Sequence, residues 1–195
     1  MIEYIKGEIT ELAPARMILE CAGIGYELNI SLHTYSAYNG KRQGMVYVYE
    51  VIREDARLLY GFSAREEREL FLMLTSVSGV GPNTARTILS SYPPLELMQI
   101  IASQNETALT TVKGIGLKTA QRILVDLKNK VKQVDTATAS GATAMGNARV
   151  VEEAVAALVM LGYQKAASHK VVIAILKGSP ALPVEQVIKS ALRML

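Results

Sequence analysis

The chain uses one short pattern twice. It reads Val77-Ser78-Gly79-Val80-Gly81 and, 35 residues further on, Val112-Lys113-Gly114-Ile115-Gly116. Each copy lies between segments with helical spacing of apolar residues, so each predicts a helix, a Gly-apolar-Gly turn and a second helix. Glycine permits a sharp turn where a Cβ atom would clash, and the free N–H groups that begin the second helix attract anions. Two such turns favour a protein that holds a nucleic-acid backbone.

The same turns could belong to a nucleotide-binding site, but the neighbouring residues argue against it. A dinucleotide fingerprint needs a third glycine and a preceding strand, whereas Thr84 and Thr119 occupy the third position and a helix is expected before each turn. A P-loop needs glycine directly before Lys-Ser/Thr, but Leu117 precedes Lys118. We therefore expect no nucleotide and no other cofactor.

Ordinary helical hairpins with glycine turns are the simplest alternative. Small and basic residues follow both turns, and this repeated choice favours phosphate binding over a purely structural turn. The residues that we expect at the DNA backbone are Gly79, Val80, Gly81, Asn83, Thr84, Gly114, Ile115, Gly116, Lys118, Thr119 and Arg122.

Composition indicates a globular chain. Of its 195 residues, 50% are hydrophobic and 20% are charged, which is typical of one or two folded domains. No apolar run approaches the roughly 20 residues that span a membrane, and the N-terminus lacks the basic start and apolar core of a signal peptide. The single cysteine, Cys21, cannot form an intramolecular disulfide. We therefore expect a cytoplasmic protein that does not associate with membranes.

The charge is distributed unevenly along the chain. The formal net charge is +3; residues 1–62 contribute −2, residues 63–132 contribute +3 and residues 133–195 contribute +2. The positive balance is largest around the repeated turns, but it is modest. Tight binding to nucleic acid would therefore need several copies of the chain or many backbone N–H contacts.

Residues 1–62 are expected to form a small barrel. The segment Ile24 to Ile30 alternates between apolar and other residues, as a half-buried strand does. Residues 46–52 are apolar on both faces, which predicts a strand covered on two sides. A hairpin around Pro14 and a turn at Asn39-Gly40 leave room for about five strands, which is typical of an OB-fold.

The apolar period becomes that of a helix after residue 62. Residues 63–132 predict about five short helices and no strand, and Ser63 with Glu66 fits a capping box at the start of the first. Residues 133–147 are rich in Ala, Thr, Gly and Ser and are expected to be a flexible linker. Residues 148–195 predict three further helices. The expected class is α+β multidomain: an N-terminal OB-fold β-barrel, a central all-α domain and a C-terminal three-helix domain.

A second informative stretch is Arg53-Glu54-Asp55-Ala56-Arg57-Leu58-Leu59-Tyr60-Gly61-Phe62. Glu54 and Asp55 lie where two strands should turn, and aspartate is common in turns for purely structural reasons. On a DNA-binding protein, the same two carboxylates would repel phosphates at one point while basic residues hold them elsewhere.

The two turns share the pattern apolar-x-Gly-apolar-Gly-x-x-x-Ala-x-x-Ile, which resembles the helix-hairpin-helix motif of DNA repair proteins. Together with the stretch at Glu54-Asp55, the small-residue segment and Leu161-Gly162-Tyr163 in the helical tail, they make the whole chain similar to the RuvA family. Members of this family are the DNA-binding subunits of bacterial Holliday junction branch migration complexes. The resemblance implies a double helix-hairpin-helix central domain and a UBA-like C-terminal domain. It also implies a homotetramer, or two stacked tetramers, that holds four-way junction DNA open and square without reading its sequence.

The resemblance assigns further residues. Glu54 and Asp55 match the acidic pin at the junction crossover. The segment that docks the hexameric ATPase RuvB, which drives branch migration, is matched by Leu158, Leu161, Gly162 and Tyr163, although Leu158 fits a helix-bundle core equally well. The resolvase RuvC is a further partner that the resemblance allows.

This chain departs from the family pattern at two positions. Family members often carry lysine where this chain has Asn83 and Leu117. The loss of two cations weakens the case for side-chain contacts to phosphate at these positions. The expected contacts therefore shift toward the backbone N–H groups, Lys118 and Arg122.

No catalytic site is apparent in the sequence. His33, His169 and Cys21 are isolated, so there is no His/Cys cluster to propose as a metal site, and Glu54 with Asp55 lacks the further acids of a nuclease centre. We expect a non-catalytic DNA-binding subunit that acts in recombination and DNA repair. The alternative is a structure-specific nuclease or glycosylase, because such enzymes also carry helix-hairpin-helix motifs. A helical interaction module without a DNA role is less favoured.

Overall fold

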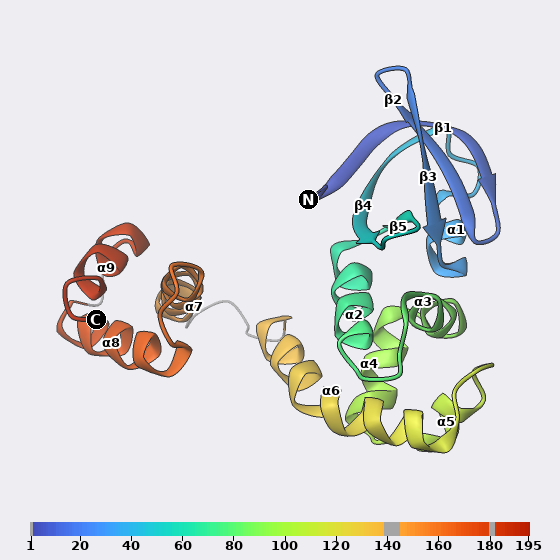
Figure 1. The fold of residues 1–195 in the computed structure, drawn as a ribbon. Coiled ribbons are helices and arrows are strands. Elements are labelled where there is room, and N and C mark those ends of the chain that lie inside the picture. The colour runs from blue at the N-terminus through green and yellow to red at the C-terminus, as the bar shows by residue number, and fades with distance from the viewer. Residues whose placement is uncertain (1, 139–144, 180–181) are drawn as a thin grey trace. The chain divides into compact units, whose positions relative to one another are not determined.

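The computed structural model describes residues 2–138, 145–179 and 182–195 (Figure 1). The chain divides into two compact units, Met1–Val134 and Asp135–Leu195. Each unit has its own buried core, and each is described separately.

The first unit begins with a closed five-stranded barrel, as expected for an OB-fold. Its strands are β1 (Tyr4–Ala13), β2 (Arg16–Cys21), β3 (Ile24–Ile30), β4 (Gln43–Ile52) and β5 (Arg57–Phe62). They follow the order β1-β2-β3-β5-β4, and β1 closes the barrel by pairing with β4. Only the β3–β5 pair is parallel. Helix α1 (Leu32–Tyr38), which the alternation of residues did not predict, connects β3 to β4.

Strand β4 is covered on both of its faces, as its sequence predicts. Val46 and Val48 point into the barrel and are buried there. Tyr47, Tyr49 and Val51 point outward and pack against the core of the helices that follow the barrel. Apolar residues therefore appear at consecutive positions because one strand serves two cores.

Five helices follow the barrel, in agreement with the sequence. They are α2 (Arg65–Thr75), α3 (Pro82–Ser91), α4 (Pro94–Ala102), α5 (Glu106–Thr110) and α6 (Leu117–Thr138). Phe71 of α2 lies among barrel rings, with centroid distances of 5.0 Å to Tyr60 and 4.9 Å to Phe62. Because Tyr60 and Phe62 belong to β5, one side of the barrel belongs to the core of the helices, while the barrel interior forms a second core. Residues 1–62 and 63–132, expected as two domains, thus form one compact unit.

A fully buried carboxylate joins three elements at this junction. Glu67 of α2 accepts hydrogen bonds from the hydroxyls of Ser31 and Thr34, which lie at the start of α1. It also accepts from the N–H and the hydroxyl of Ser63, directly after β5, at 3.2 and 3.1 Å. The expected capping box is wrong in its partner, because Ser63 bonds Glu67 rather than Glu66, and Ala64 occupies the N-cap position without a side-chain cap.

The second unit is a three-helix bundle, as expected. It consists of α7 (Met145–Met160), α8 (Lys165–Gly178) and α9 (Val184–Ala191). Its core contains Ala154, Val155, Leu158, Val172, Leu176, Val187 and Ala191. The expected linker at 133–147 is helical at both ends, because α6 continues to Thr138 and α7 begins at Met145. Its central residues, 139–144, lie outside the described residues.

Candidate nucleic-acid interface

The two Gly-x-Gly turns have the same backbone conformation. Gly79 has a φ angle of 91° and Gly114 has one of 89°, in the left-handed region that residues with a Cβ atom adopt only at a cost. In each turn the N–H of the central apolar residue donates to the carbonyl three residues earlier, at 3.0 Å in both copies. The repeat in the sequence is therefore also a repeat in the structure.

The central residues of the turns anchor them from inside. Val80 and Ile115 are buried, with exposed fractions of 4% and 5%, and their N–H groups donate to Val77 and Val112. Their side chains and N–H groups are thus used within the protein. Both residues are expected at the DNA backbone from the sequence, and that expectation stays a prediction; in the structure their side chains and N–H groups fix the turn from inside.

The second glycine of each turn borders open space. A Cβ atom built on Gly81 or Gly116 would meet nothing within 4 Å. Neither glycine is required by a neighbouring group of the protein, and Gly81 has an ordinary φ of −84°. Open space beside a backbone N–H is what a phosphate group needs in order to approach closely.

Helices α3 and α6 begin at these glycines with unsatisfied donors. Within the described part of the chain, the N–H groups of Gly81, Asn83 and Thr84 have no acceptor, and no side chain caps α3. At α6 the N–H groups of Gly116, Leu117, Lys118 and Thr119 likewise have no acceptor among the described residues. Pro82 supplies no N–H in the first copy, so the second turn offers one donor more. Both helix starts are suited to bind an anion, and the helix dipole adds to this.

Cations are concentrated at the second turn. Lys118 is exposed, and the residues that the structure describes include no partner for its ammonium group. Arg122 donates from Nη1 to the carbonyl of Ser78, at 3.1 Å, and so connects α6 to the first turn. The remaining guanidinium donors of Arg122 are available to a phosphate.

The two positions without lysine do not offer a cation to DNA. The Oδ1 atom of Asn83 accepts a hydrogen bond from the Tyr60 hydroxyl at 3.2 Å, which directs this side chain toward the barrel. Leu117 is an apolar side chain with 55% of its surface exposed. In this chain, the first turn therefore presents mainly its backbone, and the second presents backbone and cations.

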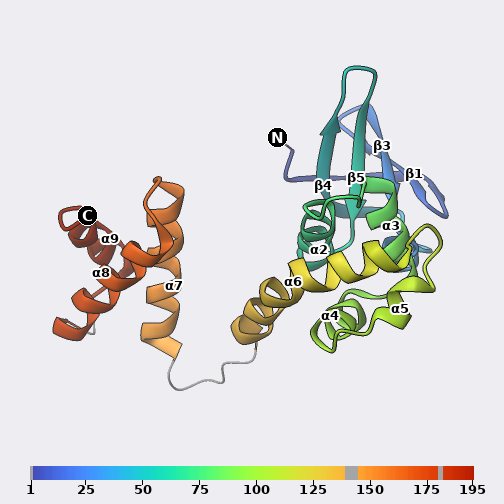
Figure 2. The same ribbon diagram turned by 60° about the horizontal axis from the view of Figure 1, so that its bottom comes forward.

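The acidic pair lies on the loop between β4 and β5, where the sequence predicts a turn. Arg53 N–H donates to the carbonyl of Ala56 at 2.8 Å and closes the loop. Glu54 and Asp55 are exposed, and neither forms an ion pair with any residue that the structure describes. The loop projects away from helices α2 and α3 (Figure 2). Two negative charges are therefore held at the tip of a two-stranded extension of the barrel.

Some of the residues that match the RuvB-docking segment of the family lie in the core of the bundle, and others lie at its surface. Leu158 is fully buried in the bundle, whereas Leu161 is 60% exposed. Gly162 has a φ of 97°, and the N–H of Tyr163 donates to the carbonyl of Leu158 at 3.1 Å, so this glycine ends α7. Met160, which no sequence pattern singles out, is 89% exposed beside Leu161.

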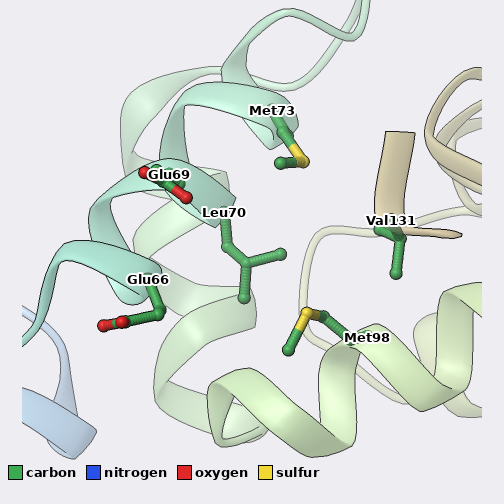
Figure 3. A pocket seen from close by; sticks show the side chains of 6 residues that line it. All are labelled: Glu66, Glu69, Leu70, Met73, Met98 and Val131. Atoms are coloured by element: carbon green, nitrogen blue, oxygen red, sulfur yellow. The ribbon is translucent and has the colours of Figure 1, made fainter. Parts of the chain in front are cut away.

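A pocket among α2, α4 and α6 is too small for a cofactor (Figure 3). Its volume is about 10 Å³, and it is lined by Glu66, Glu69, Leu70, Met73, Met98 and Val131. That volume is at the lower limit for one water molecule. Among the described residues, no group of three or more His, Cys, Asp or Glu side chains could hold a metal ion. Nor does any helix in the described ranges have the length and apolar character to cross a bilayer.

A closed barrel that shares its core with two equivalent helix-hairpin-helix turns defines a class: proteins that bind the DNA backbone. Three family models match the chain, namely RuvA N terminal domain over residues 1–61, SAM-like Helix-hairpin-helix tandem over residues 71–129, and RuvA, C-terminal domain over residues 149–195. A protein of Parabacteroides distasonis named Holliday junction branch migration complex subunit RuvA is 73% identical over 196 residues. Proteins of the same name from Bacteroides thetaiotaomicron and Porphyromonas gingivalis are each 55% identical, and every match covers 100% of both chains. The chain belongs to the RuvA family.

The two glycines of the first turn should respond differently to alanine. Gly79→Ala should lower the free energy of unfolding by about 1–2 kcal/mol, because a Cβ atom strains its left-handed backbone. Gly81→Ala should leave stability within about 0.5 kcal/mol, yet weaken DNA binding by about tenfold, the scale of one lost charge-assisted hydrogen bond. Urea unfolding and fluorescence anisotropy with labelled DNA measure both effects. Full DNA affinity in Gly81→Ala would show that phosphate does not approach this turn.

Proposed function

We propose that this chain binds four-way (Holliday) junction DNA without sequence specificity, holds the junction open and square, and recruits the RuvB ATPase for branch migration in recombination and DNA repair. The observation that carries the proposal is the pair of equivalent turns with free N–H groups, combined in one compact unit with an exposed acidic loop. The name borne by its full-length relatives, Holliday junction branch migration complex subunit RuvA, supports it.

The two turns would bind phosphates of the duplex arms. Backbone N–H groups contact phosphate oxygens in the same way whatever the base sequence, so this binding positions the DNA without reading it. The chain has a formal net charge of only +3. Several copies are therefore needed for tight binding, and we propose a homotetramer whose four-fold symmetry matches the four arms, either alone or as two stacked tetramers.

The acidic loop would act where the arms meet. Glu54 and Asp55 carry negative charge that repels a phosphate approaching the loop tip, while the turns hold phosphates elsewhere. The loop repels phosphates and the turns attract them. This combination favours binding of a crossover, where the strands are separated, over binding of a continuous duplex. In this proposal the protein is a non-catalytic, cytoplasmic component, and the ATPase supplies the work of migration. Cleavage of DNA by the purified protein with magnesium would instead support the nuclease alternative.

The C-terminal bundle would dock the motor through its exposed residues. Leu161 and Tyr163 follow α7 at the surface, and Met160 extends the same apolar strip. Exposed apolar residues grouped in this way are typical of a protein interface. Leu158, fully buried, would support these residues from the bundle core rather than touch RuvB. Contact with the resolvase RuvC is a further proposal that rests on the family resemblance alone.

Competition between DNA forms tests the main proposal. A synthetic four-way junction should outcompete linear duplex of the same length and composition by about a hundredfold, the scale of avidity when several sites engage one ligand. Glu54→Gln combined with Asp55→Asn should retain or increase junction affinity, because repulsion is removed, and should alter the rate of RuvB-driven migration. Equal affinity of the wild type for both DNA forms would contradict the proposal. A large loss of junction binding in the double variant would contradict the assigned role of the acidic loop.

A matched pair of leucine variants tests the docking surface. Leu161→Ala should reduce RuvB binding by about fivefold or more, as truncation of an interface anchor does, without a change in the melting temperature. Leu158→Ala should lower the free energy of unfolding of the bundle by about 2–5 kcal/mol because it leaves a cavity. Calorimetric titration with RuvB and thermal unfolding separate the two effects. Unchanged RuvB binding in Leu161→Ala would place the docking surface elsewhere.

A further inference from the structure

One face of α3 is hydrogen-bonded to the barrel along its length. Three polar residues of this helix recur at the spacing of a single helix face, and each has a partner in the first 60 residues. The Tyr60 hydroxyl donates to Asn83 Oδ1 at 3.2 Å, Arg86 Nη1 donates to the Ala15 carbonyl at 3.1 Å and to Asn29 Oδ1 at 3.2 Å, and the Leu32 N–H donates to Ser90 Oγ at 3.1 Å.

Arg86 is the central link of this face, because it reaches two barrel elements at once. The Ala15 carbonyl lies in the turn between β1 and β2, where it also accepts the N–H of Ile30 at 3.1 Å. Asn29, in β3, also contacts β5, because its Nδ2 donates to the Leu59 carbonyl at 3.2 Å. A guanidinium group presents several donors in a fixed plane, so it can hold two acceptors in one geometry.

These contacts connect the two parts of the proposed DNA-binding surface. Helix α3 starts at the first Gly-x-Gly turn, and β5 starts at Arg57, directly after the acidic loop. Arg86 links α3 to β5 through Asn29 and Leu59, and Tyr60 links β5 to α3 through Asn83. The placement of the acidic loop relative to the first turn therefore depends on this face of α3.

Among the residues that the structure describes, the second hairpin has no equivalent of this link. The positions 35 residues after Asn83 and Arg86 are Lys118 and Gln121, and both are exposed. Within the described residues neither side chain has a hydrogen-bond partner. The same two positions of the repeat thus hydrogen-bond to the barrel in the first hairpin, where Asn83 is exposed and Arg86 is half-buried, but not in the second.

We propose that Arg86 is a positioning residue that sets the preference for four-way junctions over duplex, by fixing the first phosphate-binding turn relative to the acidic loop, and that it is not a phosphate ligand. The inference rests on the proposed junction-binding function. A duplex does not use the acidic loop, so its binding is insensitive to the placement of that loop. A junction brings its crossover phosphates close to the loop. When the charged loop is displaced relative to the turns, it repels phosphates that it clears in the native arrangement, so junction binding depends on Arg86. Neutralising Glu54 and Asp55 removes this repulsion and therefore does not weaken junction binding.

The test uses the 195-residue chain and four substitutions, the fourth being the partial rescue Arg86→Lys. Arg86→Met keeps the aliphatic stem but removes the donors, Lys118→Met removes an exposed cation at the second turn, and Arg193→Met removes one positive charge from the second unit as a matched control. Affinities for a four-way junction and for a duplex of equal length are measured between 50 and 300 mM salt, roughly the range in which phosphate contacts are resolved. The melting temperature of each variant is recorded.

Arg86→Met should lower the junction-to-duplex affinity ratio by about fivefold to tenfold, the scale of one lost hydrogen-bonded link. Its duplex affinity and the salt dependence of duplex binding should match those of Arg193→Met. Lys118→Met should instead reduce the slope of log K against log salt concentration by about 0.9 for each subunit whose phosphate contact is lost. Arg86→Lys, which restores one donor, should recover part of the ratio.

Each other outcome overturns the inference. A reduced salt slope in Arg86→Met would make Arg86 a phosphate ligand. Equal losses for junction and duplex, together with a lower melting temperature, would make its role merely structural. An unchanged ratio in Arg86→Met, with a wild type that prefers junctions, would refute the inference while leaving the proposed function intact. A wild type without any preference would refute the proposed function, and the inference with it.

Discussion

The buried carboxylate of Glu67 is the interaction on which the first unit depends. Burying a charged carboxylate is costly unless hydrogen bonds replace its hydration. Here the donors come from the start of α1 and from the residue that follows β5, up to 36 residues away in the sequence. The carboxylate is satisfied only when barrel and helices are both in place, so it couples their folding. Beside it, the rings of Phe71, Tyr60 and Phe62 make the apolar core continuous across the same boundary.

Because Glu67 and the aromatic rings join the barrel to the helices, the repeated turns and the acidic loop are parts of one compact unit. A helix-hairpin-helix turn alone offers a few N–H donors and no selectivity for DNA form. In this chain two equivalent turns are bridged by Arg122 and Ser78, and both belong to the unit that carries Glu54 and Asp55. In the proposed function, one compact unit therefore presents both the attraction and the repulsion that junction binding requires. The second unit has a separate core, in keeping with the separate role in recruiting the motor that we propose for it.

Features that depend only on neighbouring residues, such as turns and the faces of strands, can be predicted from the sequence. Gly79 and Gly114 are predictable because a left-handed backbone favours glycine, and the double-faced strand β4 is predictable because it is apolar at consecutive positions. Helix α1, the partners of Glu67 and the barrel contacts of Arg86 are not predictable in this way, since each depends on residues distant in the chain. Val80 and Ile115 show the same limit: the pattern locates the turn, but only the fold shows that both residues face inward. The burial of Leu158, left open by its helical spacing, is likewise decided by packing in the bundle.

Native-state hydrogen exchange in increasing urea tests most directly whether barrel and hairpins form one cooperative unit. The slowest amides of the barrel, such as those of Leu28 and Val48, should share one unfolding free energy and one urea dependence with buried amides of the hairpins, such as those of Leu89 and Ile123. Amides of the second unit are free to differ. Barrel amides that exchange through a separate opening of lower free energy, while the hairpin amides stay protected, would contradict the account.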